Sequence, residues 1–270
     1  MNISAKEKSR TKMKKKLVIL VLGLLSITLI MCLNPFAKHD NIDKDIKKTL
    51  VMGVSLDYPP FEFMHLGKPQ GFDIDLAYML ANELDFKLEI KDMDFGSLIP
   101  ALNSKQIDFI ISAMSPSPER ARNVDFTKLY YQAKIEILTL DSKDTEAVSR
   151  FENKKIGVQM GSTMETYLKK KQAGIPSLEI LSIARVPALI EELKIGRIDG
   201  VLLDAEIARK IISKNPNLKS KVIEDFIGGN AVVLPLKSEL TKAFNYALDN
   251  LEKEGKLRSL EQKWIVESKE

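Results

Sequence analysis

The chain is poor in the residues on which disulfides, metal sites and many active sites depend. Its 270 residues include one cysteine, Cys32, one tryptophan and two histidines, His39 and His65. A single cysteine excludes an internal disulfide and any multi-cysteine metal site. The sequence also offers no Ser-His-Asp arrangement, no phosphate-binding glycine loop and no reactive cysteine after Cys32. We therefore expect a protein that is not an enzyme and that holds no metal and no cofactor.

Long hydrophobic runs are scarce as well. The uncharged run Leu17–Met31 follows seven basic residues and is too short to be a comfortable membrane span. A basic segment before a short apolar one is typical of an export signal, which we predict over residues 1–31. Without the seven basic residues and Glu7, the formal net charge of +4 becomes about −2. We therefore expect no nucleic-acid partner.

Cys32 directly follows the apolar run and resembles the lipid-modified cysteine of a bacterial lipoprotein, although Met31 stands where a small residue is usual. The alternative is an ordinary signal peptide with a buried or removed thiol. Residues 32–48, rich in charged and polar side chains, are predicted to form a tether between membrane and folded domain. This predicts a periplasmic protein, or one on the outer face of a membrane and lipid-anchored at Cys32.

From Thr49 onward, strand-like and helix-like segments alternate, which indicates an α/β fold. The polar stretch 141–149 has no apolar period and indicates a boundary between two lobes. We predict a first lobe over 49–138 and 230–270 and a second over 139–229. Each lobe is expected to hold a mostly parallel sheet flanked by helices, and two hinge strands near 135–140 and 231–236 are expected to join them. Strands are also predicted over 49–55, 86–91, 107–112, 155–160, 178–182 and 198–204, and helices over 73–84, 98–104, 186–194, 205–214, 239–253 and 256–266.

Polar residues follow several of these strands, where ligands bind in open α/β sheets. Ser117 is predicted to cap a helix that carries Arg120 in its first turn, an arrangement suited to a carboxylate. The plainer interpretation is that Arg120 is a solvated surface residue. Asp204, at the end of a strand, suits an ammonium group, and Tyr58 with Phe95 can cover an aliphatic or cationic side chain. Together these residues fit an amino acid.

Eight motifs, in this order and spacing, resemble the family 3 extracellular solute-binding proteins, which are polar amino-acid receptors of ABC importers with the type II periplasmic-binding-protein fold. The resemblance covers residues 50–265. The motifs are YPPFEF (58–63), GFDIDLA (71–77), DFGSLIPAL (94–102), IDFIISAMSPSPER (107–120), VDFTKLYY (124–131), IGVQMGST (156–163), GRIDGVLLD (196–204) and EGKLRSLEQKW (254–264).

The resemblance implies a role for particular side chains. Arg120 would hold the ligand's α-carboxylate with Ser115 and Thr163, and Asp204 would hold the α-ammonium with Ser112. Tyr58 and Phe95 match the aromatic pair that sandwiches the ligand's side chain. The implied site also contains Ala113, Met114, Gln159 and Ser162. Ser55, Asp57 and Glu62 are candidate side-chain contacts beside these, and a solvated carboxylate is the alternative interpretation of Glu62.

The same resemblance implies lobes that close on the ligand and a monomer that delivers it to an ABC permease. The side-chain pocket departs from the family pattern at Ser55 and Gln159, which leaves its specificity open. We expect arginine or another basic amino acid, with Asp57, Glu62 or Gln159 as side-chain partners, and glutamine next. Exported cyclohexadienyl dehydratases resemble the same family, so an enzyme on this fold is one alternative. A ligand-sensing module is another.

Overall fold

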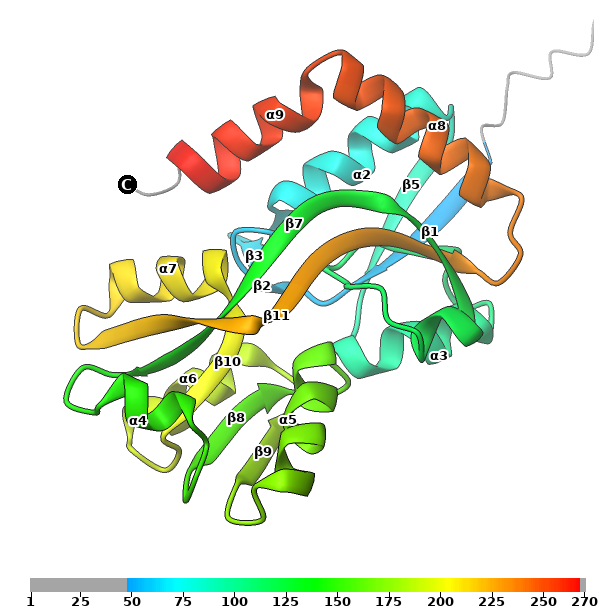
Figure 1. The fold of residues 1–270 in the computed structure, drawn as a ribbon. Helices are drawn as coiled ribbons and strands as arrows, with labels where there is room; N and C mark the ends of the chain where they lie inside the picture. Colours follow the sequence, from blue (N-terminus) through cyan, green and yellow to red (C-terminus); the bar gives the residue numbers. More distant parts are fainter. Residues whose placement is uncertain (1–47, 268–270) are drawn as a thin grey trace, which may run out of the picture. The chain divides into compact units, whose positions relative to one another are not determined.

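The computed structural model describes residues 48–267; the predicted leader, Cys32 and the tether up to residue 47 lie outside them. An eight-stranded sheet runs through this part in the order β5-β1-β6-β11-β7-β10-β8-β9 (Figure 1). Its strands are β1 (Thr49–Val54), β5 (Lys87–Asp92), β6 (Phe109–Ile110), β7 (Val124–Leu140), β8 (Lys155–Gln159), β9 (Glu179–Ile183), β10 (Gly200–Asp204) and β11 (Leu218–Pro235).

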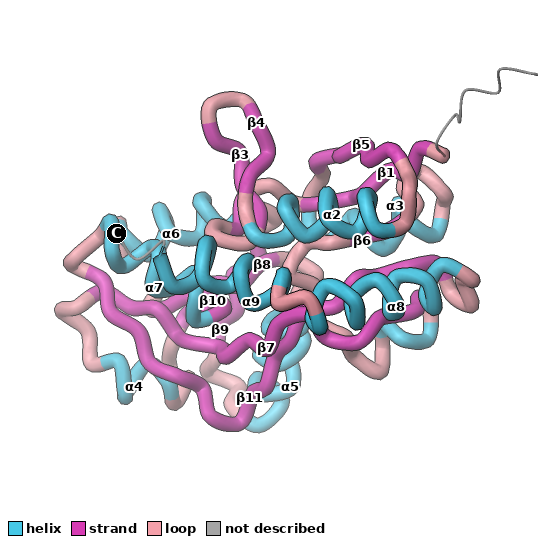
Figure 2. The backbone as a smooth tube through the Cα atoms, turned by 90° about the horizontal axis from the view of Figure 1, so that it is seen from above, coloured by secondary structure: helices cyan, strands magenta, loops and turns pink. Residues whose placement is uncertain are grey.

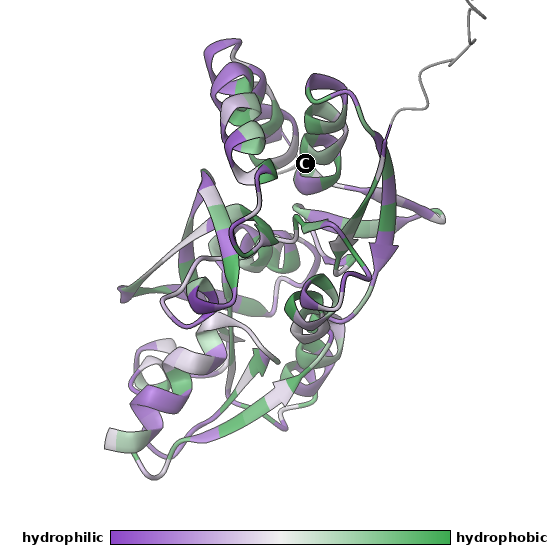
Figure 3. Cartoon of the chain, turned by 90° about the vertical axis from the view of Figure 1, so that its right-hand side faces the viewer, coloured by the Kyte–Doolittle hydropathy of each residue, from purple (hydrophilic) through white to green (hydrophobic). Residues whose placement is uncertain are grey.

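Helices flank this sheet, as the alternating sequence pattern predicts. They are α2 (Phe72–Glu83), α3 (Leu98–Asn103), α4 (Thr145–Ser149), α5 (Thr163–Gly174), α6 (Val186–Lys194), α7 (Ala205–Lys214), α8 (Leu240–Lys253) and α9 (Lys256–Glu261), with the single turns η1 (Phe95–Ser97), η2 (Arg120–Arg122) and η3 (Gln262–Val266). Hydrophobic residues run through the strands and along the helices, which also carry hydrophilic stretches (Figure 3). Within residues 48–267, no helix combines the length and the apolar character that a membrane span requires.

The two ends of the sheet form the two lobes. In the first lobe, β1 pairs in parallel with β5 and β6, and α3 packs on β1 and β6. In the second, β8 pairs in parallel with β9 and β10. Gly53 explains how closely α3 approaches β1, because an added Cβ at this glycine would lie 2.3 Å from Ile107 Cδ1 and 3.0 Å from Leu98 Cδ2. The prediction of an α/β fold with mostly parallel strands is confirmed.

Two long antiparallel strands, β7 and β11, connect the lobes and lie side by side through both (Figure 1). The predicted hinge segments 135–140 and 231–236 fall mostly within these strands, which are 17 and 18 residues long. Their register shifts between Val222 and Ile227 and again around Ala231. Such irregularities locally break the ladder and raise the twist of the strand pair. The lobe boundaries near 138 and 229 therefore fall inside continuous strands, and their exact positions remain a prediction.

A second, small sheet places residues at the cleft. It contains β2 (Asp57–Tyr58), β3 (Glu62–His65) and β4 (Lys68–Gln70), with Tyr58 paired to Glu62. The tip of the β3–β4 hairpin projects away from the rest of the fold (Figure 2), whereas its base contacts β2 and α2. Because Tyr58 and Glu62 lie at that base, both are buried.

The structure corrects two local predictions. Asp73 does not cap α2, because Gly71 occupies the N-cap with a φ of 129°, and the Asp73 carboxylate instead accepts hydrogen bonds from the Ala113 N–H and the Tyr130 hydroxyl. An added Cβ at Gly71 would lie 2.1 Å from the Phe61 carbonyl oxygen, so only glycine fits there. The helix predicted after Ser117 is only the short turn η2, although the Ser117 hydroxyl does accept the Arg120 N–H.

Candidate ligand-binding site

A small, nearly filled cavity of about 20 Å³ lies where the two lobes meet. The first lobe contributes residues from β2, β3 and η1 and from the loop between β6 and η2. The second contributes the end of β8, the start of α5 and the end of β10. The lining residues are Tyr58, Glu62, Phe95, Ser112, Ala113, Ser115, Arg120, Gln159, Ser162, Thr163, Met164 and Asp204.

Arg120 bridges the two lobes at one end of this cavity. Its Nη1 donates to the Ser115 carbonyl at 2.5 Å, and its Nη2 donates to the Gly161 carbonyl of the second lobe at 2.9 Å. The Phe95 ring lies 5.4 Å from the guanidinium carbon and covers one face of this cation. Burial lowers the pKa of Arg120 to about 10, so the side chain stays charged at neutral pH. The guanidinium is therefore a fixed positive group in the cavity wall.

Asp204 supplies negative charge from the opposite lobe. It occupies the N-cap of α7, yet its carboxylate caps no backbone N–H among the described residues. Its own N–H donates to the Tyr58 hydroxyl at 3.1 Å, which joins β10 to β2 across the cleft. Burial raises the pKa of Asp204 to about 7, although a hydrogen bond from Tyr58 opposes this shift. A cation placed beside this carboxylate would restore its charge.

Glu62, which lines the cavity, and Asp73, which does not, form a second acidic group. Glu62 is 1% exposed, and its Oε1 accepts the Ser112 hydroxyl at 3.0 Å, whereas its Oε2 accepts no hydrogen bond from residues 48–267. Burial and the charge of Asp73 raise the pKa of Glu62 well above its usual value, and burial raises that of Asp73 to about 7. Two carboxyl groups this close hold a proton readily, and a cation reaching Glu62 would displace it.

The second lobe closes the cavity with the start of α5. Ser162 caps this helix, since its hydroxyl accepts the Glu165 N–H, and Thr163 is the first helical residue. Gly161 precedes them with a φ of 79°, and an added Cβ there would lie 2.8 Å from the Gly96 Cα of the first lobe. The two lobes thus meet backbone to backbone beside Arg120, and only a glycine allows this approach.

The structure brings most of the predicted site residues together around one cavity. Three lie elsewhere: Met114 packs in a hydrophobic cluster with Phe95, Ser55 donates its hydroxyl to Asp57, and Asp57 accepts the Val186 N–H of α6. Met164, which the sequence reasoning missed, lines the cavity. Its place directly after Thr163, in the first turn of a helix that faces the cleft, was the signal available. Among the described residues, no group of His, Cys, Asp or Glu side chains is arranged to hold a metal ion.

Comparison with known proteins gives a consistent result. The model of the bacterial extracellular solute-binding proteins, family 3, matches residues 50–267. The arginine-binding extracellular protein ArtP of Bacillus subtilis is 35% identical over 260 residues, which cover 95% of this chain and all of ArtP. The L-cystine-binding protein TcyJ of Escherichia coli is 28% identical over a match that covers 91% of this chain and 94% of TcyJ. The crystal structure of an ancestral arginine-binding protein bound to glutamine superposes with a TM-score of 0.75 at 36% identity, over 81% of this chain and 98% of that one.

Proposed function

Because the chain belongs to the bacterial extracellular solute-binding proteins, family 3, we propose that its inter-lobe cavity binds an amino acid with a cationic side chain, arginine first. The type II periplasmic-binding-protein fold of its structural relatives is built for this task, since the ligand lies between two lobes that close on it. Glutamine is the next candidate, because one arginine-binding relative also holds glutamine.

The arrangement of charges around the cavity carries this proposal. One guanidinium, Arg120, faces two buried carboxyl groups with raised pKa values, Glu62 and Asp204. A basic amino acid has the complementary set, with one carboxylate and two cationic groups. Its carboxylate would pair with Arg120 in a bidentate manner, its α-ammonium with Asp204, and its side-chain cation with the free oxygen of Glu62. A neutral ligand would leave Glu62 protonated and without an ionic partner.

Further predictions concern where this protein acts and what it contacts once it has been exported. We expect it to deliver the ligand, as a monomer, to an ABC permease and to be anchored to a membrane through a lipid on Cys32. Cys32 lies outside the described residues, and the support for lipidation is its place directly after the apolar run. Cys32→Ala is expected to move the protein from the membrane fraction to the soluble fraction after cell lysis. Membrane association that survives this change would argue for an uncleaved signal anchor.

The direct test of function is a thermal-shift screen against the common L-amino acids, followed by calorimetry on each ligand that stabilises the protein. A ligand that binds only the folded state raises the melting temperature, and the stabilisation grows with the logarithm of the ratio of ligand concentration to Kd. We expect arginine and lysine to give larger shifts than glutamine, and D-arginine to give none. Turnover of prephenate or arogenate by the same sample would instead favour a dehydratase.

A further inference from the structure

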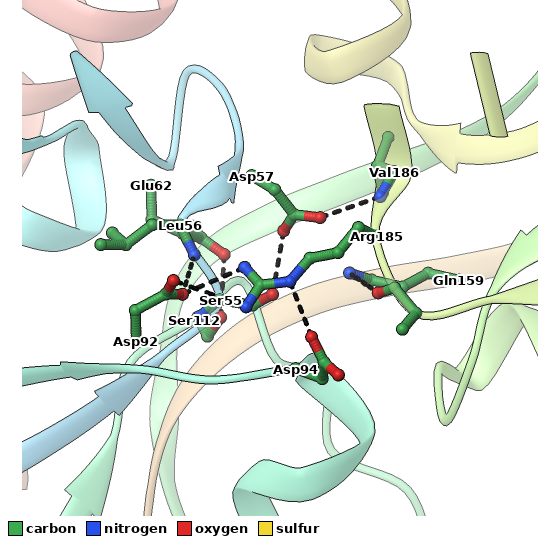
Figure 4. Close-up of polar contacts among 11 residues, drawn as sticks. Ser55, Leu56, Asp57, Glu62, Asp92, Asp94, Ser112, Gln159, Arg185 and Val186 are labelled. Atoms are coloured by element: carbon green, nitrogen blue, oxygen red, sulfur yellow. Dashed lines mark hydrogen bonds and ion pairs between the residues drawn. The ribbon is translucent and has the colours of Figure 1, made fainter. Parts of the chain in front are cut away.

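A cluster of charged contacts joins the two lobes outside the ligand cavity. Arg185 lies in the second lobe, between β9 and α6, and reaches two carboxylates of the first lobe (Figure 4). Its Nε donates to Asp94 at 2.7 Å, while Nη1 and Nη2 donate to the two oxygens of Asp92 at 3.1 and 3.4 Å. One planar guanidinium therefore makes three hydrogen bonds to carboxylates that belong to the opposite lobe.

A second contact in the same place completes the N-terminus of α6. Arg185 is the N-cap of this helix, and its side chain caps no backbone N–H among the described residues. The first N–H, that of Val186, donates instead to Asp57 Oδ2 at 2.8 Å (Figure 4). A carboxylate at a helix N-terminus satisfies an otherwise free N–H and interacts favourably with the helix dipole. A helix of the second lobe thus receives its cap from the first lobe.

We propose that Arg185, Asp57, Asp92 and Asp94 form an inter-lobe latch that raises ligand affinity without touching the ligand. All of these bonds cross the cleft, so they exist only while the lobes are together. They therefore raise the population of the closed arrangement, and the apparent affinity of a ligand increases with the population of its binding-competent state. The proposal rests on the proposed function, since it concerns affinity for the ligand between the lobes.

Two of the three acceptors of the latch, Asp57 and Asp92, are held in place within the first lobe. Asp92 Oδ1 also accepts the Leu56 N–H at 3.0 Å, and Asp57 Oδ1 accepts the Ser55 hydroxyl at 2.9 Å. Both sets of bonds lie within the first lobe. Isolated ion pairs on a surface contribute little, largely because two mobile side chains must be ordered. Here Asp57 and Asp92 are already held, so only Arg185 and Asp94 have to be ordered, and the planar fork of Arg185 is suited to paired carboxylates.

The test compares Arg185→Ala with Arg197→Ala as a matched control. Arg197 is also an arginine of the second lobe, but its partner, Glu192, belongs to the same lobe. By calorimetry and stopped flow, Arg185→Ala is expected to weaken ligand binding about tenfold, which corresponds to about 1.4 kcal/mol, mostly through faster dissociation. Raising the salt concentration should weaken ligand binding by the wild-type protein more than ligand binding by the Arg185→Ala variant. Arg197→Ala should bind as the wild-type protein does.

A double-mutant cycle separates the latch from other effects of the substitution. Asp94 is the cleaner partner, because Asp92 also orders the loop at Leu56. If the latch acts through this pair, Asp94→Ala should weaken binding less in the Arg185→Ala background than in the wild-type protein. Additive effects of the two substitutions would contradict an Arg185–Asp94 latch.

Lobe closure can also be measured without relying on ligand affinity. Spin labels on Glu89→Cys in the first lobe and Lys194→Cys in the second, both exposed, would report the distance between the lobes in a Cys32→Ser background. We expect Arg185→Ala to shift this distance distribution toward longer values and Arg197→Ala to leave it unchanged. An unchanged distribution together with wild-type affinity would overturn the latch. If the wild-type protein bound none of the amino acids, the proposed function would fail, while the distance measurement would still test the latch.

Discussion

The ligand cavity and the inter-lobe latch use the same groups, a guanidinium and carboxyl groups of which at least one lies in the opposite lobe, in different surroundings. In the cavity the carboxyl groups are almost fully buried, and burial raises their pKa values. In the latch, Arg185 and its partners Asp92 and Asp94 are partly exposed and already paired with one another. Buried charged groups without an ionic partner favour a ligand that supplies one, whereas paired groups at the rim can only hold the lobes together. The comparison separates recognition from closure.

The largest effect is expected at the cavity end of this comparison. Arg120→Ala would leave the ligand's carboxylate unpaired in a closed cleft, at a cost of about 2 to 5 kcal/mol. Calorimetry should therefore show a loss of affinity of at least about 30-fold. Arg122→Ala, in the same short turn but exposed, is the matched control and should bind nearly as the wild-type protein does. Equal effects of the two substitutions would place the carboxylate elsewhere.

Asp204 should link both stability and binding to pH. Burial raises its pKa from 3.8 to about 7, so the folded protein holds this proton more tightly than the unfolded chain. Its contribution to the free energy of unfolding is complete below about pH 4, declines as the pH rises, and is lost above about pH 7. A cationic ligand needs the ionised form, so the ligand-induced increase in melting temperature should grow from about pH 5 to about pH 8.

Asp204→Asn provides the check on this assignment. Differential scanning fluorimetry over the same pH range should show a weaker dependence of the unliganded melting temperature, because one titrating group is gone. The dependence should not vanish, since burial also raises the pKa values of Asp73 and Glu62. A pH dependence of binding as steep as that of the wild-type protein would assign the titration to those two residues.

Gly161 lies at the contact between the two lobes beside Arg120 and should affect closure through its shape. In Gly161→Ala the new Cβ would meet the Gly96 Cα at 2.8 Å, and the φ of 79° would be strained. Gly196→Ala is the control: Gly196 has a φ of 74°, but its added Cβ would meet no atom within 4 Å. This variant therefore shows the effect of backbone strain without a clash. Both variants should lose about 1 kcal/mol of stability, but only Gly161→Ala should lose affinity as well, by about tenfold if closing costs a further 1.4 kcal/mol. Equal affinities would mean that the lobes close without this contact.

The smallest effect is expected at the capping residue of the latch. Asp57→Asn keeps an oxygen that can accept the Val186 N–H but removes the charge next to the N-terminus of α6. Such a charge contributes about 0.3 to 1 kcal/mol, so affinity should fall about two- to fivefold. Asp57→Ala also removes the acceptor and should cost more. A large loss with Asp57→Asn would suggest that Asp57 contacts the ligand directly.

Sequence reasoning succeeded where the signal was local. Helices α6 and α7 begin and end at the predicted residues. The signals that predicted them, the spacing of their apolar residues and the neighbouring strands, lie within or beside the helices themselves in the sequence. The convergence of Arg120 and Asp204 was predicted too, because both were placed at the carboxyl ends of strands, where ligands bind in open α/β sheets.

What the sequence did not reveal depends on partners distant in the chain. Asp73 was predicted to be a helix cap. Nothing in the neighbouring sequence shows that its carboxylate accepts the N–H of Ala113, 40 residues away. Asp57 was predicted to contact the ligand, whereas its observed partner is Val186, 129 residues away in the other lobe. A short polar side chain fits either role, and only the folded chain brings the second partner near.

The central position of β11 has a consequence for the order in which this protein can fold. Its residue Val233 pairs with Ile110 of β6 in the first lobe, so β6 gains this neighbour only from a segment synthesised more than a hundred residues later. Pairings between such distant segments form slowly. A growing chain that cannot complete its first sheet stays unfolded longer, and an unfolded chain is the form that a secretion channel can thread. The strand that joins the lobes would thereby also help to keep the protein ready for export.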